Sequence, residues 1–339
     1  MRVYTDALCR ELYLKSTLAQ SLITVYIGGG TPSLLPDACF TQIFSCLRDN
    51  YQLSRDVEVT VEANPGTLTQ AKADLLVSLG VNRMSIGVQS FNDDELRFLG
   101  RIHTAADALD SLELIRKSGL SNYSIDLMYG IQGQSVDSWH ETITQGTECM
   151  PKHISAYELT PEEGTPIFNK IRPPEEEIIL EMYDHAIDSL SLHGYEQYEI
   201  SNFAQSGFQC AHNLTYWDRG GYIGAGAGAH SFINGLRLNT LKDLHGYIER
   251  LNSNLLPETE TMRISPEEHL REFLFLGLRK TVGITIREAK RIGLDVVSAG
   301  SEMLETGHLE MRDDSLRLTR KGTVIANSVF VRLFQYLGL

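Results

Sequence analysis

The stretch Ile23-Thr-Val-Tyr-Ile-Gly-Gly-Gly-Thr-Pro-Ser-Leu-Leu-Pro36 decides the fold. β-Branched and aromatic residues dominate positions 23–27, which predicts a short buried strand. Three glycines follow at once, and glycine lets backbone N–H groups come close to a ligand because it has no Cβ. In α/β proteins, small molecules bind at the carboxyl ends of parallel strands. A tight turn with nothing bound explains the three glycines equally well, and the pattern is neither G-x-G-x-x-G nor a P-loop.

Strand-like and helical patterns alternate on both sides of this stretch. A helix is predicted at 4–20, ahead of the first strand, and further helices at 37–50, 70–79, 93–99, 105–118, 135–147 and 175–193. Strands are predicted at 57–62, 83–88, 123–129, 153–159 and 196–200. Such alternation is typical of parallel strands with right-handed crossovers. About six βα units result, which is fewer than the eight of a closed barrel. We therefore expect an α/β fold with a partial, open TIM-like (β/α)6 barrel.

The pattern changes twice after the barrel, which predicts three parts at 1–203, 204–264 and 265–339. The segment 204–239 is rich in glycine and aromatic residues without a clear period, so we expect a long ligand-facing loop or insert. The last part is predicted as helices at 266–279, 286–291, 296–306 and 323–336, with a hairpin at 311–318. This order suggests a smaller winged-helix-like α+β domain. Its 11 Lys+Arg and 10 Asp+Glu are not a nucleic-acid-binding footprint, so a packing role is preferred.

Composition restricts the function classes further. The chain has 339 residues, of which 42% are hydrophobic, and a net charge of −14, which argues against nonspecific binding to nucleic acid or anionic membranes. Its five cysteines lie far apart, as expected of reduced cytosolic thiols. No long apolar run or signal peptide is present. A cytoplasmic location is therefore expected.

Polar residues stand at the predicted strand ends, where an α/β barrel places its active site. They are Glu62, Gln89, Arg101 and Asp126. Together they offer two carboxylates, an amide and a guanidinium, which suit a ligand with an ammonium group, a carboxylate and a ribose diol. Each residue alone is explained as well by a helix cap or a surface ion pair.

Five motifs resemble the oxygen-independent coproporphyrinogen III oxidase-like family of radical S-adenosylmethionine (SAM) proteins. They are the segments 26–33 (YIGGGTPS), 61–66 (VEANPG), 87–91 (GVQSF), 100–103 (GRIH) and 125–130 (IDLMYG), and the similarity continues through 195–202 and 226–230 into the last part. The resemblance implies a partial barrel whose strand ends hold SAM. By position, Gly29, Gly30, Thr31 and Glu62 would meet the methionyl amine, Arg101 its carboxylate, and Gln89 and Asp126 the ribose.

Within that family, the segment 210–217 (CAHNLTYW) resembles the His-Asn-x-x-Tyr-Trp signature of the haem-chaperone branch. The resemblance implies haem contacts from His212, Asn213, Tyr216 and Trp217. An imidazole can ligate haem iron, and aromatic rings offer flat faces to a macrocycle. We therefore treat His212 as the candidate haem iron ligand. A structural His-Asn pair in an aromatic loop is the alternative explanation.

The sequence departs from the family in its cysteines. The family carries Cys-x-x-x-Cys-x-x-Cys after its first strand, where three thiolates hold a [4Fe–4S] cluster. No cysteines here have that spacing, and Cys39 and Cys46, the closest pair, lie seven residues apart. We expect the motif and the first barrel strand to lie upstream of Met1, or else to be missing from a natural truncation. As given, the chain has no ligand set for a [4Fe–4S] cluster. A smaller departure is Gln132, where relatives generally have proline.

Three functions remain open at this point. The first is a haem chaperone that binds haem and SAM and passes haem to a membrane acceptor protein, with a homodimer as one assembly to consider. The second is a radical SAM oxidoreductase of the coproporphyrinogen dehydrogenase type, which would act on propionates. The third is a catalytically silent SAM- or haem-binding protein. The segment 210–217 favours the chaperone.

Overall fold

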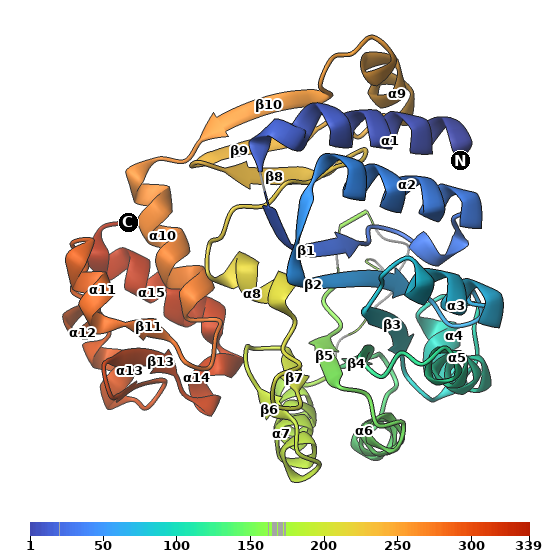
Figure 1. Cartoon of the computed structure of the whole chain (residues 1–339). Helices are drawn as coiled ribbons and strands as arrows, with labels where there is room; N and C mark the ends of the chain where they lie inside the picture. Colours follow the sequence, from blue (N-terminus) through green and yellow to red (C-terminus); the bar gives the residue numbers. More distant parts are fainter. Residues whose placement is uncertain (20, 162, 165–167, 169–171, 173) are drawn as a thin grey trace.

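The computed structural model describes residues 1–19, 21–161, 163–164, 168, 172 and 174–339. A curled sheet with the strand order β1-β2-β3-β4-β5-β7-β6 forms the centre of the chain. Its first five strands are parallel: β1 (Ser21–Ile27), β2 (Gln52–Ala63), β3 (Arg83–Gln89), β4 (Tyr123–Tyr129) and β5 (His153–Glu158). Helices cover the outer side of the curl: α1 (Arg2–Lys15), α2 (Asp37–Asn50), α3 (Gln70–Ser78), α4 (Asp93–Phe98), α5 (Ala105–Lys117), α6 (Val136–Glu148) and α7 (Glu176–Leu192) (Figure 1). The predicted partial α/β barrel is confirmed.

The central strands alternate between apolar and polar residues. Val59 and Val61 in β2, and Ile125 and Leu127 in β4, are buried in one hydrophobic core. Alternate residues of a strand point to opposite faces, so Glu62 and Asp126 face the concave side instead. The barrel interior is therefore polar, and the apolar faces of the strands pack against the helices.

The first strand is less buried than its sequence predicts. Ile23 is 64% exposed, and Val25 is the hydrophobic residue of β1 that is buried. The reason is topological, because β1 lies at one edge of the sheet and pairs with β2 on one side. A β-branched run alone does not distinguish an edge strand from a central one.

The predicted sixth parallel strand at 196–200 is wrong. This region forms two short strands, β6 (Glu196–Gln197) and β7 (Asn202–Ala204), and β7 runs antiparallel to β5. The buried Glu199 lies in the turn between them and accepts hydrogen bonds from the Ser201 amide (3.0 Å) and the Asn202 side chain. A carboxylate that binds the backbone two residues ahead favours a reversal of the chain over a continuous strand.

The segment 204–239, predicted as a long loop or a ligand-facing insert, contains regular structure. It forms helix α8 (Ala211–Trp217) and a hairpin of β8 (His230–Ile233) and β9 (Leu236–Thr240). Asn234 and Gly235 both have positive φ at the turn (52° and 74°), as expected of an Asn-Gly hairpin. After α9 (Leu244–Asn252), strand β10 (Glu258–Arg263) completes a three-stranded sheet.

The last part of the chain forms its own hydrophobic cluster, with helices around a sheet of order β11-β13-β12. Its elements are α10 (Pro266–Gly277), β11 (Ile284–Thr285), α11 (Ile286–Arg291), α12 (Val296–Ala299), α13 (Ser301–Glu305), β12 (Leu309–Arg312), β13 (Ser315–Leu318), α14 (Arg320–Val324) and α15 (Ala326–Leu337). The predicted hairpin is present. The helix predicted at 296–306 is broken at Gly300, and the last predicted helix is divided at Ile325.

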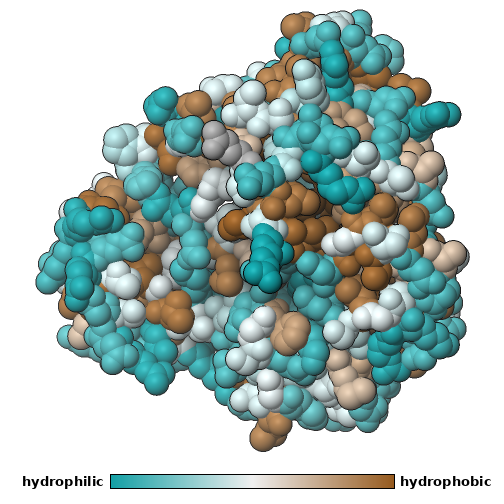
Figure 2. All heavy atoms as spheres, viewed as in Figure 1, coloured by the Kyte–Doolittle hydropathy of each residue, from teal (hydrophilic) through white to brown (hydrophobic). Residues whose placement is uncertain are grey.

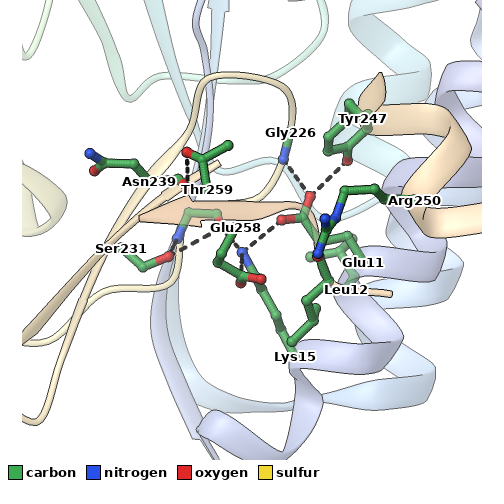
Figure 3. A network of polar contacts seen from close by, with 12 residues as sticks. Glu11, Leu12, Lys15, Gly226, Ser231, Asn239, Tyr247, Arg250, Glu258 and Thr259 are labelled. Atoms are coloured by element: carbon green, nitrogen blue, oxygen red, sulfur yellow. Dashed lines mark hydrogen bonds and ion pairs between the residues drawn. The ribbon is translucent and has the colours of Figure 1, made fainter. Parts of the chain in front are cut away.

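A buried ionic network joins the first helix to the segment after the barrel (Figure 3). Lys15 and Glu11, both fully buried, form an ion pair of 2.6 Å, and Glu258 lies 3.2 Å from the same ammonium group. The second oxygen of Glu11 accepts hydrogen bonds from the Gly226 amide and the Tyr247 hydroxyl, each at 2.7 Å. The buried charges of Lys15 and Glu11 are thus paired and hydrogen-bonded, as burial of a charge requires. The network fixes α1 against α9 and the loop before β8.

In the described part of the chain, no helix combines the length and the apolar character that crossing a bilayer requires.

Candidate functional site

Glu62 is the centre of a first group of polar residues at the carboxyl ends of β1 and β2. Its carboxylate accepts hydrogen bonds from the Tyr26 hydroxyl (2.8 Å) and the Gly29 amide (3.3 Å). A Cβ on Gly28 would lie 2.8 Å from that carboxylate, so the turn approaches it as closely as only glycine allows. Gly29 and Gly30 have φ of +81° and +125°, which require glycine as well. The glycine turn therefore exposes a carboxylate and backbone amides together.

Arg101, Gln89 and Asn64 form a second group of polar residues beside the first. Arg101 donates to Asn64 Oδ1 (3.3 Å), and Asn64 in turn donates to Thr31 Oγ1 (3.0 Å). A Cβ on Gly87 would lie 2.9 Å from Gln89 Nε2, 3.0 Å from Asn64 Oδ1 and 3.4 Å from the Arg101 guanidinium. These three side chains therefore converge over one glycine of β3.

Asp126 completes the site from β4. Its carboxylate lies 3.4 Å from the Ser85 hydroxyl, which donates to it. Loss of hydration raises the pKa of Asp126 from 3.8 to about 6, against opposing hydrogen bonds from Ser155 and Ser85 and the nearby charge of Arg83. Carboxyls with raised pKa values are typical of functional sites.

The seven residues predicted to hold SAM fall into these adjoining groups, and the donor set fits that ligand. A carboxylate suits an ammonium group, a guanidinium suits a carboxylate, and an amide with a second carboxylate suits a diol. The prediction missed Tyr26, Asn64 and Ser85, which connect the residues. The signal that could have found them was the position of Tyr26 and Ser85 on the polar face of their strands, and of Asn64 directly after β2.

The cysteines do not fit an iron–sulfur cluster. Among the residues that the structure describes, no three or more His, Cys, Asp or Glu side chains form a group that could hold a metal ion. Cys9 and Cys46 lie together, with Cys46 Sγ 3.3 Å from the Cys9 carbonyl oxygen, and all five thiols are free. A [4Fe–4S] cluster takes four thiolates or their equivalents.

Helix α8 packs beside β1, and the backbone amides of its first turn bind Glu58 of β2. The amides of Ala211 and His212 each donate to the Glu58 carboxylate at 3.0 Å. An acidic side chain is favourable at a helix N-terminus because the first amides there have no partner in the helix. Cys210, just before the helix, is buried, and burial raises the pKa of its thiol to about 11. It is therefore a neutral thiol near pH 7.

His212 lies between the barrel and the rest of α8. Its Nδ1 is 2.9 Å from Thr24 Oγ1, and its Nε2 is 3.1 Å from the Tyr216 hydroxyl. The ring stacks on Tyr26 with centroids 4.8 Å apart and an interplanar angle of 19°. Burial lowers the pKa of His212, so the imidazole is neutral, which is the form that ligates metals. Tyr26 contacts Glu62 and His212 at once and thereby connects the two candidate sites.

Two cavities flank α8. The first, of about 800 Å³, follows β1 and is bordered by the glycine turn, His212 and Tyr216. Figure 2 shows hydrophobic side chains gathered around a hollow over β1 on this face. The second, of about 470 Å³, includes Asn213, Tyr216 and Trp217 in its wall. The four residues predicted to contact haem are therefore divided between two cavities, and Tyr216 borders both.

Two family models match the chain. The Radical SAM superfamily matches residues 13–145, and the HemN C-terminal domain matches residues 264–325. The first match covers the strand ends that carry the candidate SAM site. The second begins just before α10.

Known proteins resemble the chain over nearly its whole length. The heme chaperone HemW of Bacillus subtilis is 36% identical over 96% of this chain and 90% of its own length. A mitochondrial radical S-adenosyl methionine domain-containing protein 1 of Danio rerio is 34% identical over 94% and 77%. The structure of coproporphyrinogen III oxidase (HemN) from Escherichia coli superposes with a TM-score of 0.84 at 21% identity, over 98% of this chain and 83% of that one. That likeness confirms the fold. The chain belongs to the radical SAM family that includes the heme chaperone HemW.

Proposed function

We propose that this chain is a haem chaperone of the radical SAM type, which binds haem and SAM and delivers haem to a membrane acceptor protein. The observation that carries the proposal is the position of α8. The helix places His212 and Tyr216 in the wall of one cavity and Asn213, Tyr216 and Trp217 in the wall of the other. Relatives at 33–38% identity over most of the chain are named heme chaperones.

The local geometry supports His212 over Cys210 as the haem iron ligand. A neutral imidazole has a free lone pair once its hydrogen bond to the Tyr216 hydroxyl opens. The Cys210 thiol is buried, has a raised pKa and donates to Glu58 at 3.6 Å, so forming a thiolate there is unfavourable. We infer that Nε2 of His212 exchanges the Tyr216 hydroxyl for iron.

The strand-end residues support SAM as the second ligand. Membership of the radical SAM family implies SAM and a [4Fe–4S] cluster. In this chain, Glu62 and the Gly29 amide would face the methionyl amine, Arg101 its carboxylate, and Gln89 and Asp126 the ribose hydroxyls. Because Tyr26 donates to Glu62 and stacks on His212, a ligand that moves Glu62 would also shift the ring that supports His212. We further propose that the chain is organised as a barrel core (1–203), a haem-contacting connection that includes α8 (204–264) and a smaller C-terminal domain (265–339), and that a second copy of the chain is a candidate partner.

Titration of the full-length chain with haemin, followed by the Soret band, tests the proposal. We expect saturable binding with a sharpened Soret band, which His212→Ala weakens or shifts. Cys210→Ser is the matched control and should leave the spectrum unchanged. Tyr216→Phe keeps the ring but removes the hydroxyl that competes for Nε2, so it should strengthen the spectral signature of imidazole ligation.

Two results would contradict the proposal. If the wild-type chain does not bind haemin saturably, the chaperone function fails. If His212→Ala, Cys210→Ser and the double variant all keep the wild-type spectrum and affinity, haem binds elsewhere, and the role assigned to α8 fails.

A further inference from the structure

The second cavity has features that the candidate haem ligand alone does not explain. It lies between the end of the barrel sheet, α8, the β8–β9 hairpin and α10. Three arginines border it, together with the carboxylates of Glu199 and Glu272: Arg219 follows α8, Arg237 lies in β9, and Arg279 follows α10. The cavity wall therefore carries an excess of one positive charge, in a chain whose net charge is −14.

The guanidinium groups differ in how well they are neutralised. Arg237 forms an ion pair with Glu272. Arg279 lies 3.9 Å from Glu199, which is beyond hydrogen-bond distance. Arg219 contacts His269, and an imidazole is either neutral or positive, so the histidine does not neutralise the arginine. Arg219 and Arg279 are thus the two arginines of this cavity that no carboxylate in the described ranges holds in a hydrogen-bonded ion pair, so they can bind an anionic ligand.

Unpaired polar atoms are concentrated at this cavity. Counting partners among the residues that the structure describes, Nε of Arg219, Nε of Arg279 and Nε1 of Trp217 are buried without an acceptor. A buried donor without a partner costs about 1–3 kcal/mol, and such groups are rare in folded proteins. Three buried donors without an acceptor, against two buried acceptors without a donor among the described residues (Oε2 of Glu199 and Oδ1 of Asn202), indicate that a ligand with several acceptor atoms belongs at this cavity.

The remaining wall is aromatic. The Arg279 guanidinium lies over the Trp217 ring, 4.6 Å from its centroid. Tyr216 and Tyr222 meet edge to face at 4.6 Å, and Phe232 follows at 6.4 Å from Tyr222. Flat rings beside guanidinium groups suit a ligand that is itself flat and conjugated and that carries carboxylates at one edge, because arginine binds carboxylates bidentately. The volume of about 470 Å³ falls in the range of small-molecule sites.

We propose that this cavity binds the carboxylate edge of a flat, conjugated anion, with Arg219 and Arg279 as the carboxylate ligands and Trp217 against the ring system. The inference rests on the proposed function, under which the anion is haem and the carboxylates are its two propionates. It adds a specificity element, because iron ligation by His212 does not distinguish haem from its esters, whereas a pair of arginines does.

The test compares porphyrins with and without free carboxylates on the full-length chain. Haemin and haemin dimethyl ester are titrated in the same buffer into the wild type, Arg219→Gln and Arg279→Gln. The control is Arg287→Gln, which removes an arginine whose side chain is 89% exposed on α11. We expect the wild type to prefer haemin by at least about tenfold, the low end for hydrogen bonds to charged groups. Each cavity variant should lose about tenfold for haemin and little for the ester, and the control should behave as the wild type.

A second readout does not depend on iron. The chain has two tryptophans, Trp139 and Trp217, and the first is fully buried between α6 and α7. In a Trp139→Phe background, iron-free protoporphyrin should quench Trp217 fluorescence at lower concentration than its dimethyl ester does. Arg219→Gln should abolish that difference. Arg279→Gln removes the cation beside the buried Glu199 and can therefore destabilise the fold. Arg219→Gln leaves no buried carboxylate without its cation. If Arg279→Gln does not fold, the result with Arg219→Gln decides the test.

The failures of the two proposals are distinguishable. Saturable haemin binding with equal affinity for the dimethyl ester overturns the carboxylate site and leaves the chaperone function standing. Discrimination that survives in Arg219→Gln and in folded Arg279→Gln overturns the assignment of these arginines. Absence of saturable binding of any of the porphyrins overturns the chaperone function, and this inference with it.

Discussion

The substitution Asp126→Asn should stabilise the chain while weakening its ligand site. The pKa of this carboxyl is raised from 3.8 to about 6 in the folded chain, mainly by loss of hydration. Because the folded pKa lies above the unfolded one, the ionised folded form carries a penalty. That penalty is fully present above about pH 6 and declines as the pH falls towards 3.8. Asparagine keeps the size and an acceptor for Ser85 but carries no charge, so it removes the penalty.

The expected size follows from the two pKa values. The difference of about two units corresponds to ~3 kcal/mol in the free energy of unfolding at pH 8. At pH 4.5 the folded carboxyl is protonated and the unfolded one partly so, which reduces the penalty to ~1 kcal/mol. A residue needed for ligand binding often lowers the stability of the fold, so replacing it is expected to raise stability and weaken function.

Urea unfolding of both proteins at pH 8 and pH 4.5 measures the effect. The comparison isolates Asp126, since the other titratable groups are shared by the two proteins. We expect Asp126→Asn to be more stable by 2 to ~3 kcal/mol at pH 8 and by only ~1 kcal/mol at pH 4.5. A gain that is the same at both values, or a loss of stability at pH 8, would refute the desolvation argument.

Three further outcomes are expected. Arg101→Ala should weaken SAM binding by about 1.5–3 kcal/mol in calorimetric titration, and Asp126→Asn by less, while Arg97→Ala on the exposed side of α4 should match the wild type; equal affinity for the wild type and Arg101→Ala would remove the assignment. Glu11→Ala should destabilise the fold by about 3–5 kcal/mol because Lys15 stays buried, and the double variant Glu11→Leu/Lys15→Met should cost less than Glu11→Ala alone, so a larger cost for the double variant would contradict the network. Anaerobic reconstitution of the chain as given should leave it without a stoichiometric [4Fe–4S] cluster, which four iron atoms per chain with a dithionite-bleached absorption band would disprove.

Local sequence patterns were sufficient for most of the barrel. Helix α2 begins and ends where its apolar period predicts, and β4 coincides with its predicted range. The strand ends brought the predicted SAM residues together because parallel strands share one carboxyl edge. The burial of each residue was harder to predict from sequence. Ile23 is exposed because β1 pairs with a strand on one side, which the residues of β1 do not reveal.

The rest depended on contacts between distant residues. The reversal at Glu199 follows from a side-chain hydrogen bond that no periodicity encodes. Arg219 and Arg279, which follow α8 and α10, lie sixty residues apart in sequence and border one cavity only because α10 packs beside α8. The neutral state of His212 depends on its burial beside Thr24 and Tyr26, which the motif around it does not reveal.

Transfer of haem from the loaded chain is the most direct test of the chaperone function. The wild-type chain is saturated with haemin, freed of excess, and mixed by stopped flow with vesicles that carry a membrane haem protein in its haem-free form. We predict that the Soret band of the acceptor forms at a rate that rises with acceptor concentration, as the proposed delivery in a complex of the two proteins requires. A rate that is independent of acceptor concentration and equal to the spontaneous loss of haem from the chain would contradict the account.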